Sequence, residues 1–285
     1  TNMTQINGYQ AMITQHQWMF LSSFECLRKI IKDIEITNLV HLGARAFEEI
    51  GGEVVQTATF VFRNAKIDNY RGTYCRLLDA SSQTAKEEMF LSGKARYVAM
   101  QKDYENIPGN PIAYWISDKQ KEAFGKKKLS TYAKCCKGLD TGNNELFLRL
   151  WQEVDIHKTT VLNNCGFWVP YKGGSFRKWY GNNFYLVNWS NDGETLSNFK
   201  GSNIRNRSYH FKEGITWSTT SGSAFAGRKS PTGYLFDSKG CMAFSYGGIS
   251  LEKLLAQMNA VTFNSFLDII TPTLDFNPGP VGNVP

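Results

Sequence analysis

Arginine, lysine and asparagine side chains gather between residues 138 and 189, among glycines and large aromatic residues. Residues 172–183 read Lys-Gly-Gly-Ser-Phe-Arg-Lys-Trp-Tyr-Gly-Asn-Asn, so that Arg177 and Lys178 stand between residues that favour turns. Arginine, lysine and asparagine are the side chains that best match phosphate oxygens and base edges. We therefore expect this part of the chain to contact DNA.

A run of lysines leads directly into this segment, between residues 119 and 137. Most charge runs are solvated faces, and that interpretation stays open here. The alternative is a patch that follows the phosphate backbone, whose binding would weaken steeply with salt. We favour the phosphate patch because the run continues without a break into Gly138.

The composition allows a large core and favours an anionic partner. The 285 residues are 42% hydrophobic and 14% aromatic, with a net charge of +7 and a pI of about 9.0. The six cysteines form no Cys-x-x-Cys pair, and the four histidines offer no metal spacing, which predicts reduced thiols in a cytoplasmic protein and no metal. No signal peptide or membrane-length apolar run is visible.

The first part of the chain, to about Asn106, has the pattern of a layered α/β unit. We expect a buried strand over residues 9–14, further strands over 36–42, 54–63 and 71–79, and a helix after residue 19. Ser22 and Glu25 fit a capping box. Helical spacing predicts an apolar buried side formed by Phe24, Leu27, Ile30, Ile31 and Ile34, with Arg28 turned outward.

A second domain is expected from about residue 107, where prolines and a glycine interrupt the chain. Its predicted elements are a helix over 112–124, strands over 214–217, 234–237 and 243–245, and a helix over 250–270 with Ser250 as N-cap. The domain boundaries are thus 1–106 and 107–285.

Several of these segments resemble one family. Residues 8–20 (Gly-Tyr-Gln-Ala-Met-Ile-Thr-Gln-His-Gln-Trp-Met-Phe) and 42–62 (Leu-Gly-Ala-Arg-Ala-Phe and onward) are similar to adenine-N6 DNA methyltransferases of BREX phage-defence systems and of fused type II restriction–methylation enzymes. The resemblance implies that Phe47 stacks on the flipped-out adenine. It also implies that the S-adenosylmethionine loop and the Asn-Pro-Pro-Tyr-type motif precede Thr1, because the chain has neither; Asn110-Pro-Ile-Ala-Tyr lacks the second proline.

The second part resembles the target-recognition domain of the same enzymes. The similarity lies in Gly138-Leu-Asp-Thr-Gly-Asn-Asn, in residues 173–183 and in Val187-Asn-Trp. Arg149 has the alternative of pairing with Glu145, and we expect Trp179 and Tyr180 to pack on the core of a hairpin. The candidate DNA contacts are Lys126, Lys127, Lys128, Lys137, Thr141, Asn143, Asn144, Arg149, Lys172, Arg177, Lys178, Arg205 and Arg207.

The fold class expected is α/β (α+β overall): a partial Rossmann-like methyltransferase sheet, then a mixed α+β target-recognition domain. The resemblance implies an inactive fragment of an enzyme that uses S-adenosylmethionine, with no cofactor bound by the fragment itself. Its expected partners are double-stranded DNA, the rest of the same polypeptide and other defence-system subunits. Two alternatives stay open: a non-catalytic specificity module like a type I specificity subunit, and a carbohydrate-binding protein, which the lysine run disfavours.

Overall fold

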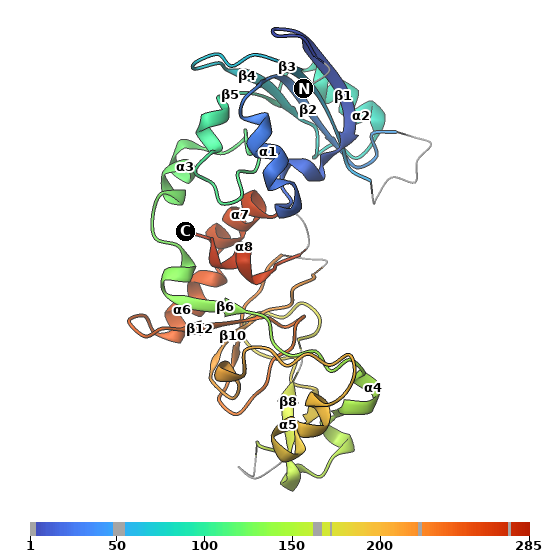
Figure 1. The fold of residues 1–285 in the computed structure, drawn as a ribbon, viewed down its shortest axis with the longest axis vertical. Coiled ribbons are helices and arrows are strands. Elements are labelled where there is room, and N and C mark those ends of the chain that lie inside the picture. Colours follow the sequence, from blue (N-terminus) through green and yellow to red (C-terminus); the bar gives the residue numbers. More distant parts are fainter. Residues whose placement is uncertain (1–3, 48–54, 162–166, 172, 222–223, 273–274) are drawn as a thin grey trace. The chain divides into compact units, whose positions relative to one another are not determined.

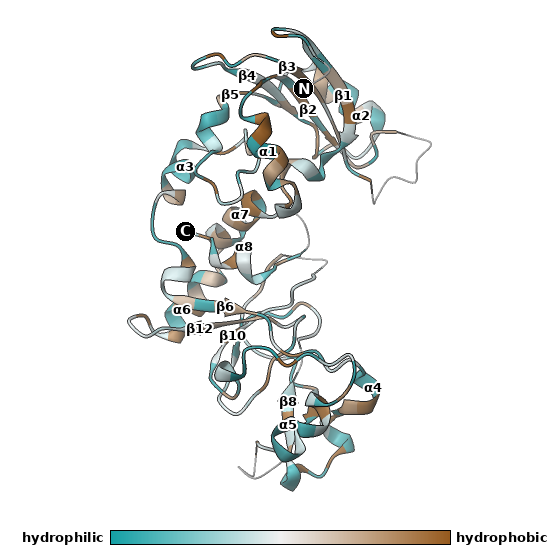
Figure 2. Cartoon of the chain, in the orientation of Figure 1, coloured by the Kyte–Doolittle hydropathy of each residue, from teal (hydrophilic) through white to brown (hydrophobic). Residues whose placement is uncertain are grey.

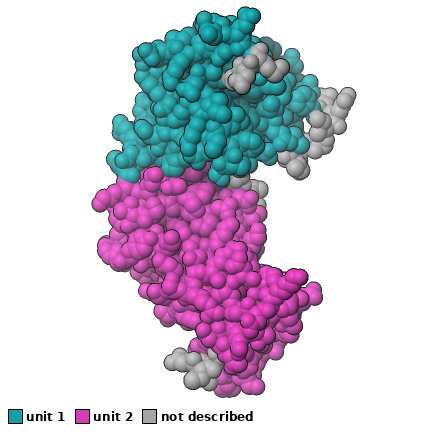
Figure 3. All heavy atoms as spheres, in the orientation of Figure 1, with its two compact units in different colours: residues 1–126 teal, residues 127–285 magenta. Residues whose placement is uncertain are grey.

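The computed structural model describes residues 4–47, 55–161, 167–171, 173–221, 224–272 and 275–285. They form two compact units, Thr1–Lys126 and Lys127–Pro285, which are coloured separately in Figure 3. The predicted mixture of helices and strands is confirmed, and the strands of the described residues belong to three sheets.

The first unit is built on a five-stranded sheet in the order β1-β3-β2-β4-β5 (Figure 1). The strands are β1 (Tyr9–Gln15), β2 (Glu35–Gly43), β3 (Thr57–Arg63), β4 (Gly72–Arg76) and β5 (Arg96–Ala99). β2 and β4 run parallel, whereas the other pairs are antiparallel. Because β3 pairs antiparallel with both β1 and β2, these two strands run in the same direction on either side of it. The helices are α1 (Glu25–Ile31), α2 (Gln83–Leu91) and α3 (Asp118–Phe124).

The second unit contains two antiparallel sheets. One has the order β11-β10-β12-β6, from Arg228–Ser230, Gly214–Thr216, Met242–Ser245 and Ala133–Cys136. The other has the order β7-β9-β8, from Leu148–Leu150, Tyr185–Asn188 and Trp168–Tyr171. The helices are α4 (Asn144–Phe147), α5 (Ser190–Ser197), α6 (Leu251–Met258), α7 (Val261–Ile270) and α8 (Pro278–Gly282). Short 3-10 helices in the two units cover His16–Met19, Ser22–Phe24, Gln101–Tyr104, Leu129–Thr131, Trp151–Glu153, Ile156–Lys158 and Arg207–Tyr209.

The segment after residue 106 packs with the first unit. The amide of Ile112 donates to the Met19 carbonyl at 2.9 Å, and the Tyr114 ring stacks on Tyr74 with centroids 4.6 Å apart. The compact units therefore divide at Lys126, twenty residues beyond the division expected near Asn106, because the aromatic contact joins residues 112–116 to β4. The catalytic and recognition roles of the two parts stay predictions.

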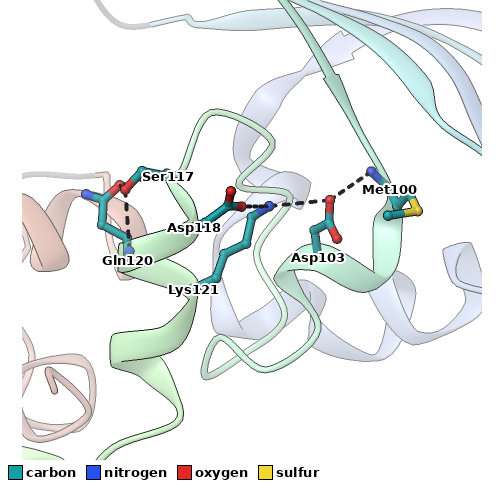
Figure 4. Close-up of polar contacts among 6 residues, drawn as sticks. All are labelled: Met100, Asp103, Ser117, Asp118, Gln120 and Lys121. Carbon is teal, nitrogen blue, oxygen red and sulfur yellow. Dashed lines mark hydrogen bonds and ion pairs between the residues drawn. The ribbon is translucent and has the colours of Figure 1, made fainter.

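The helix predicted over 112–124 forms only as α3, which begins after the N-cap Ser117. Ser117 and Gln120 make reciprocal capping contacts, shown in Figure 4. In the same view the Lys121 ammonium lies 3.0 Å from the Asp118 carboxylate and 3.4 Å from that of Asp103. Asp103 in turn accepts a hydrogen bond from the Met100 amide at 3.2 Å. This lysine of the run is thus paired within the unit.

Two predictions about the first strand and the start of the first helix are wrong. β1 is an edge strand and is not buried: Met12 and Ile13 are 49% and 58% exposed. The capping box at Ser22 does not form; Glu25 instead pairs with Lys29 at 2.9 Å.

The buried side of α1 also differs from the prediction. Ile31 and Ile34 are buried as predicted. Phe24, Leu27 and Ile30, however, are at least 39% exposed, while Arg28 is only 2% exposed. Figure 2 shows the apolar residues of α1, and several line an open apolar groove of about 500 Å³ beside Trp18 and Phe60. Helical spacing misplaced this side because the carbonyls that bind Arg28 come from distant residues.

In the second unit the predicted strands over 214–217 and 243–245 are confirmed as β10 and β12. Residues 234–237 contribute only an isolated bridge at Asp237. The long helix predicted over 250–270 is divided into α6 and α7 at Asn259 and Ala260, and the predicted N-cap Ser250 is confirmed by its contact with the Lys253 amide. The break at Asn259 matters for the loop described next.

Candidate nucleic-acid interface

Residues 175–180 carry exposed basic and aromatic side chains side by side. Arg177 and Lys178 are exposed. Trp179 and Tyr180 are 49% and 62% exposed, so the prediction that they pack on the domain core is wrong. Phe176 is also exposed, at 45%. The hairpin core is filled instead by residues of β8 and β9 such as Val169 and Val187. We call residues 174–182 the aromatic–basic loop.

The backbone of this loop is fastened to β11. The Trp179 amide donates to the Gly227 carbonyl at 2.9 Å, and the Trp179 carbonyl accepts from the Lys229 amide at 2.9 Å. Inside the loop, the buried Asn182 side chain donates to the Ser175 carbonyl at 2.7 Å. Trp179 has a φ of +76°, a left-handed conformation that is unusual for a bulky residue. These bonds hold the exposed ring at a defined place.

Two buried polar side chains form hydrogen bonds with the loop or with the residue that holds it. Asn259, 3% exposed, accepts from the Gly227 amide and donates to the Gly227 carbonyl, both at 2.9 Å. Arg228, 1% exposed, donates to the Arg177 carbonyl and to the Ser218 hydroxyl, each at 3.3 Å. Burial lowers the pKa of Arg228 to about 10, which leaves its guanidinium charged at neutral pH.

A polar crevice of about 350 Å³ lies within the same unit. Three cationic side chains line it: Lys137, Arg205 and Lys239. Asp140 holds Arg205 at 3.3 Å and also accepts a hydrogen bond from the Ser238 hydroxyl. The crevice brings together Lys137 and Arg205, which the sequence analysis had selected separately. It adds Lys239, which sequence reasoning missed because nothing near residue 239 shows a motif.

The crevice and the aromatic–basic loop meet at a close backbone contact. A Cβ on Gly173 would lie 3.1 Å from the Gly240 Cα, so the two chains pack with little space between them. Lys239 precedes Gly240, and Gly174 follows Gly173. Gly173, which has no Cβ, is buried against another segment of the unit and permits this close approach. This buried contact places the chain just before the loop against the chain just after Lys239, within the same unit.

The predicted DNA-contact residues between 141 and 149 mostly form hydrogen bonds with neighbouring residues. The Thr141 hydroxyl, 3% exposed, donates to the Asn144 side chain at 2.7 Å. Asn143 caps α4 by accepting from the Leu146 amide at 3.1 Å. Arg149 donates to the carbonyls of Glu145 and Leu148 at 2.8 and 2.6 Å, in place of the expected Glu145 carboxylate. These residues shape the turn, and their contact with DNA stays a prediction.

The remaining candidates differ in their surroundings. Arg207 pairs with Asp192 at 3.1 Å and covers the Trp189 ring at 5.5 Å. Lys126 and Lys127 are exposed and Lys128 is half-buried. Lys172 lies outside the described residues.

Phe47 belongs to the first unit and is 42% exposed, a few residues after β2. Near the end of the same strand, two buried histidines face each other: Nδ1 of His16 and Nε2 of His41 are 2.7 Å apart. Burial lowers the pKa of His16 to about 4 and that of His41 to about 3. Sequence spacing gave no signal for this pair, because 25 residues separate its members.

Two classes of site find no support in the described part of the chain. No group of three or more histidine, cysteine or acidic side chains converges there in a way that could hold a metal ion. None of the helices described is long and apolar enough to span a membrane.

Comparison with known proteins gives relatives over the whole chain. No protein-family model matches the sequence. The adenine-specific methyltransferase PglX of Lacticaseibacillus casei (strain Zhang) is 45% identical over 306 residues, which cover 100% of this chain and 26% of the relative. The adenine-specific methyltransferase BrxX of Escherichia coli O9:H4 (strain HS) is 39% identical over 286 residues, covering 98% of this chain and 24% of the relative.

One solved structure shares the fold. The Type IIL restriction–modification enzyme MmeI in complex with DNA superposes with a TM-score of 0.53 at 8% identity, over 96% of this chain and 37% of that one. At this identity the likeness concerns the fold alone. The chain spans about a quarter of the length of the curated relatives it matches, and it is homologous to that segment of the adenine-specific methyltransferases PglX and BrxX.

Proposed function

We propose that this chain is a section of an adenine-specific DNA methyltransferase whose second unit recognises the DNA target. The full enzyme transfers a methyl group from S-adenosylmethionine to adenine N6. The observation that carries the proposal is the exposed aromatic–basic loop, in a unit that also contains the polar crevice and in a chain 45% identical to PglX. Cationic side chains at such a surface bind phosphates, and amides and guanidinium groups read base edges.

The first unit fits the end of a catalytic domain better than a second recognition module. β1 and β2 run in the same direction and are joined through α1, and β2 is parallel to β4. Connections of this kind build open α/β sheets. This supports the catalytic remnant over the alternative of a non-catalytic specificity subunit.

Phe47 is the residue of this unit that we propose for the adenine pocket. An exposed aromatic ring after a strand end can hold the face of a base that has left the duplex. Changing Phe47 to alanine in the full-length enzyme should slow adenine methylation, measured by transfer of labelled methyl groups to DNA. An unchanged rate would remove Phe47 from the pocket.

The apolar groove of the first unit does not fit S-adenosylmethionine. The apolar groove of the first unit includes no acidic side chain in its lining, whereas a carboxylate commonly binds the ribose hydroxyls of such cofactors. We propose that residues outside this chain hold the cofactor, which supplies the methyl group when bound.

The DNA-binding proposal is tested with a fluorescein-labelled 30-base-pair duplex. Changing Arg177 and Lys178 together to alanine should weaken binding and lower the slope of log affinity against log salt by about 1.8, since each phosphate contact contributes about 0.9. The matched control changes Lys29 and Lys66 of the first unit to alanine. These substitutions remove the same charge, but from lysines that pair with local carboxylates. Equal losses in both double variants would show that only net charge matters and would contradict the proposed interface.

A further inference from the structure

The Trp179 side chain is half exposed, although hydrogen bonds hold its backbone in one conformation. Its left-handed backbone is strained for a side chain of this size, and such strain persists only when the surroundings impose it. Half of the side chain faces solvent. A loop with no ligand could relax by placing glycine or asparagine at this position.

The surroundings that impose this conformation come from distant parts of the unit. Both hydrogen-bonding groups of the Trp179 backbone are bonded to β11. The Gly227 carbonyl that receives the Trp179 amide is itself held by Asn259, at the break between α6 and α7. Arg228 adds a bond to the Arg177 carbonyl. Two buried polar groups on separate segments thus hold the backbone from which one exposed aromatic ring projects.

The residues around Trp179 indicate the kind of ligand that its ring would contact. The Lys178 ammonium lies 5.5 Å from the Trp179 ring centroid, and Arg177 lies over the Phe184 ring at 5.8 Å. Tyr180 follows with 62% of its surface exposed. Cations that lie beside exposed aromatic rings match a nucleic-acid strand, which offers both charged phosphates and flat bases.

We propose that Trp179, assisted by Tyr180, stacks on a DNA base that has left its place in the duplex, while Arg177 and Lys178 hold the flanking phosphates. The inference rests on the proposed DNA-binding function and assigns a specific role to one residue within it. In an intact duplex the base faces are covered by their neighbours, so an aromatic ring can stack only where a step is opened. Adenine methylation requires such an opening, because the target base must leave the stack. Since Phe47 is proposed for that adenine, the base that stacks on Trp179 is another one at the opened step.

The test compares two fluorescein-labelled 30-base-pair duplexes of equal charge, one fully paired and one with three central mismatches. The wild-type chain should bind the mismatched duplex about tenfold more tightly, the scale of one base–aromatic stack. Changing Trp179 to glycine should abolish this preference, so that the variant binds the mismatched and the paired duplex with equal affinity. Glycine is chosen because it adopts positive φ without strain, so the loop keeps its backbone.

Further variants separate the possible outcomes. Trp179→Phe should keep most of the preference, and the Arg177→Ala, Lys178→Ala double variant should lose affinity for both duplexes alike. If wild type and Trp179→Gly show the same preference while both bind paired DNA, the stacking role is overturned and the DNA-binding function stands. Absence of binding to either duplex would instead overturn the proposed function.

Discussion

Lowering the pH from 7 to 4.5 should destabilise the first unit by about 5 kcal/mol through the His16–His41 pair. At 2.7 Å, one ring nitrogen must donate a proton and the other must accept it. Protonating both rings would place two donors face to face in a buried site, where Arg76 and Lys86 also lower the pKa of His41.

The direction of this effect follows from the pKa values. Both folded-state pKa values, about 4 and about 3, lie below the ordinary histidine value of 6.5. The pair therefore contributes its full stability above pH 6.5 and loses it as the pH falls toward 4, because the unfolded chain binds protons more readily. Urea unfolding of the chain at pH 7, 5.5 and 4.5 measures the loss.

The control replaces His16 with asparagine and His41 with glutamine. These amides keep a hydrogen-bonding group near Nδ1 and Nε2 but do not titrate. The double variant should lose less stability than wild type over the same pH range, with His210 and the carboxylates contributing equally to both. Identical pH profiles for the two proteins would show that the pair does not titrate as described.

Changing Arg28 to alanine should cost the first unit about 4 kcal/mol, the loss expected when buried groups lose a charged hydrogen-bonding partner. The guanidinium donates to the Gly109 carbonyl from Nε and Nη2 at 3.0 and 2.7 Å. Its Nη1 donates to the carbonyls of Trp18 and Leu21 at 2.8 and 2.7 Å. Alanine would leave these carbonyls without their donor and detach α1 from residue 109.

Thermal and urea unfolding would measure this loss. Arg28→Lys should fall between wild type and alanine, since one ammonium can replace only some of the four bonds. Lys32→Ala, one turn further along the chain and partly exposed, should change stability by no more than about 0.5 kcal/mol. A loss below 1 kcal/mol for Arg28→Ala would mean that water satisfies the carbonyls, contrary to the arrangement described.

Local patterns predicted the strands well, because period-two alternation is a property of neighbouring residues. The segments expected over 36–42 and 54–63 are β2 and β3, whose residues Leu39 and Phe60 pair across the sheet. The same reasoning misjudged Arg28, because its partners Trp18 and Gly109 become neighbours only after folding. It also merged α6 and α7, because the bonds between Asn259 and Gly227 that accompany the break join residues 32 apart.

The sequence predicted which residue types form the candidate site, but it did not predict which of them are exposed or lie close together. Arg177 and Lys178 were found from their residue types among glycines. The exposure of Trp179 was not predicted, because an aromatic residue in a hairpin is usually buried and the strand β11 that holds it lies some fifty residues later. Lys137 and Arg205 line one crevice, where Asp140 pairs with Arg205, although they are far apart in the sequence and no spacing rule indicates their proximity.

Hydrogen–deuterium exchange of the 285-residue chain with and without excess duplex DNA tests the central claim most directly. The account predicts slower amide exchange on DNA binding in peptides that cover residues 174–182 and 203–207, with little change in β2 and β3 of the first unit. Protection confined to the first unit, or none in the aromatic–basic loop under conditions where DNA is bound, would contradict recognition of DNA by the second unit.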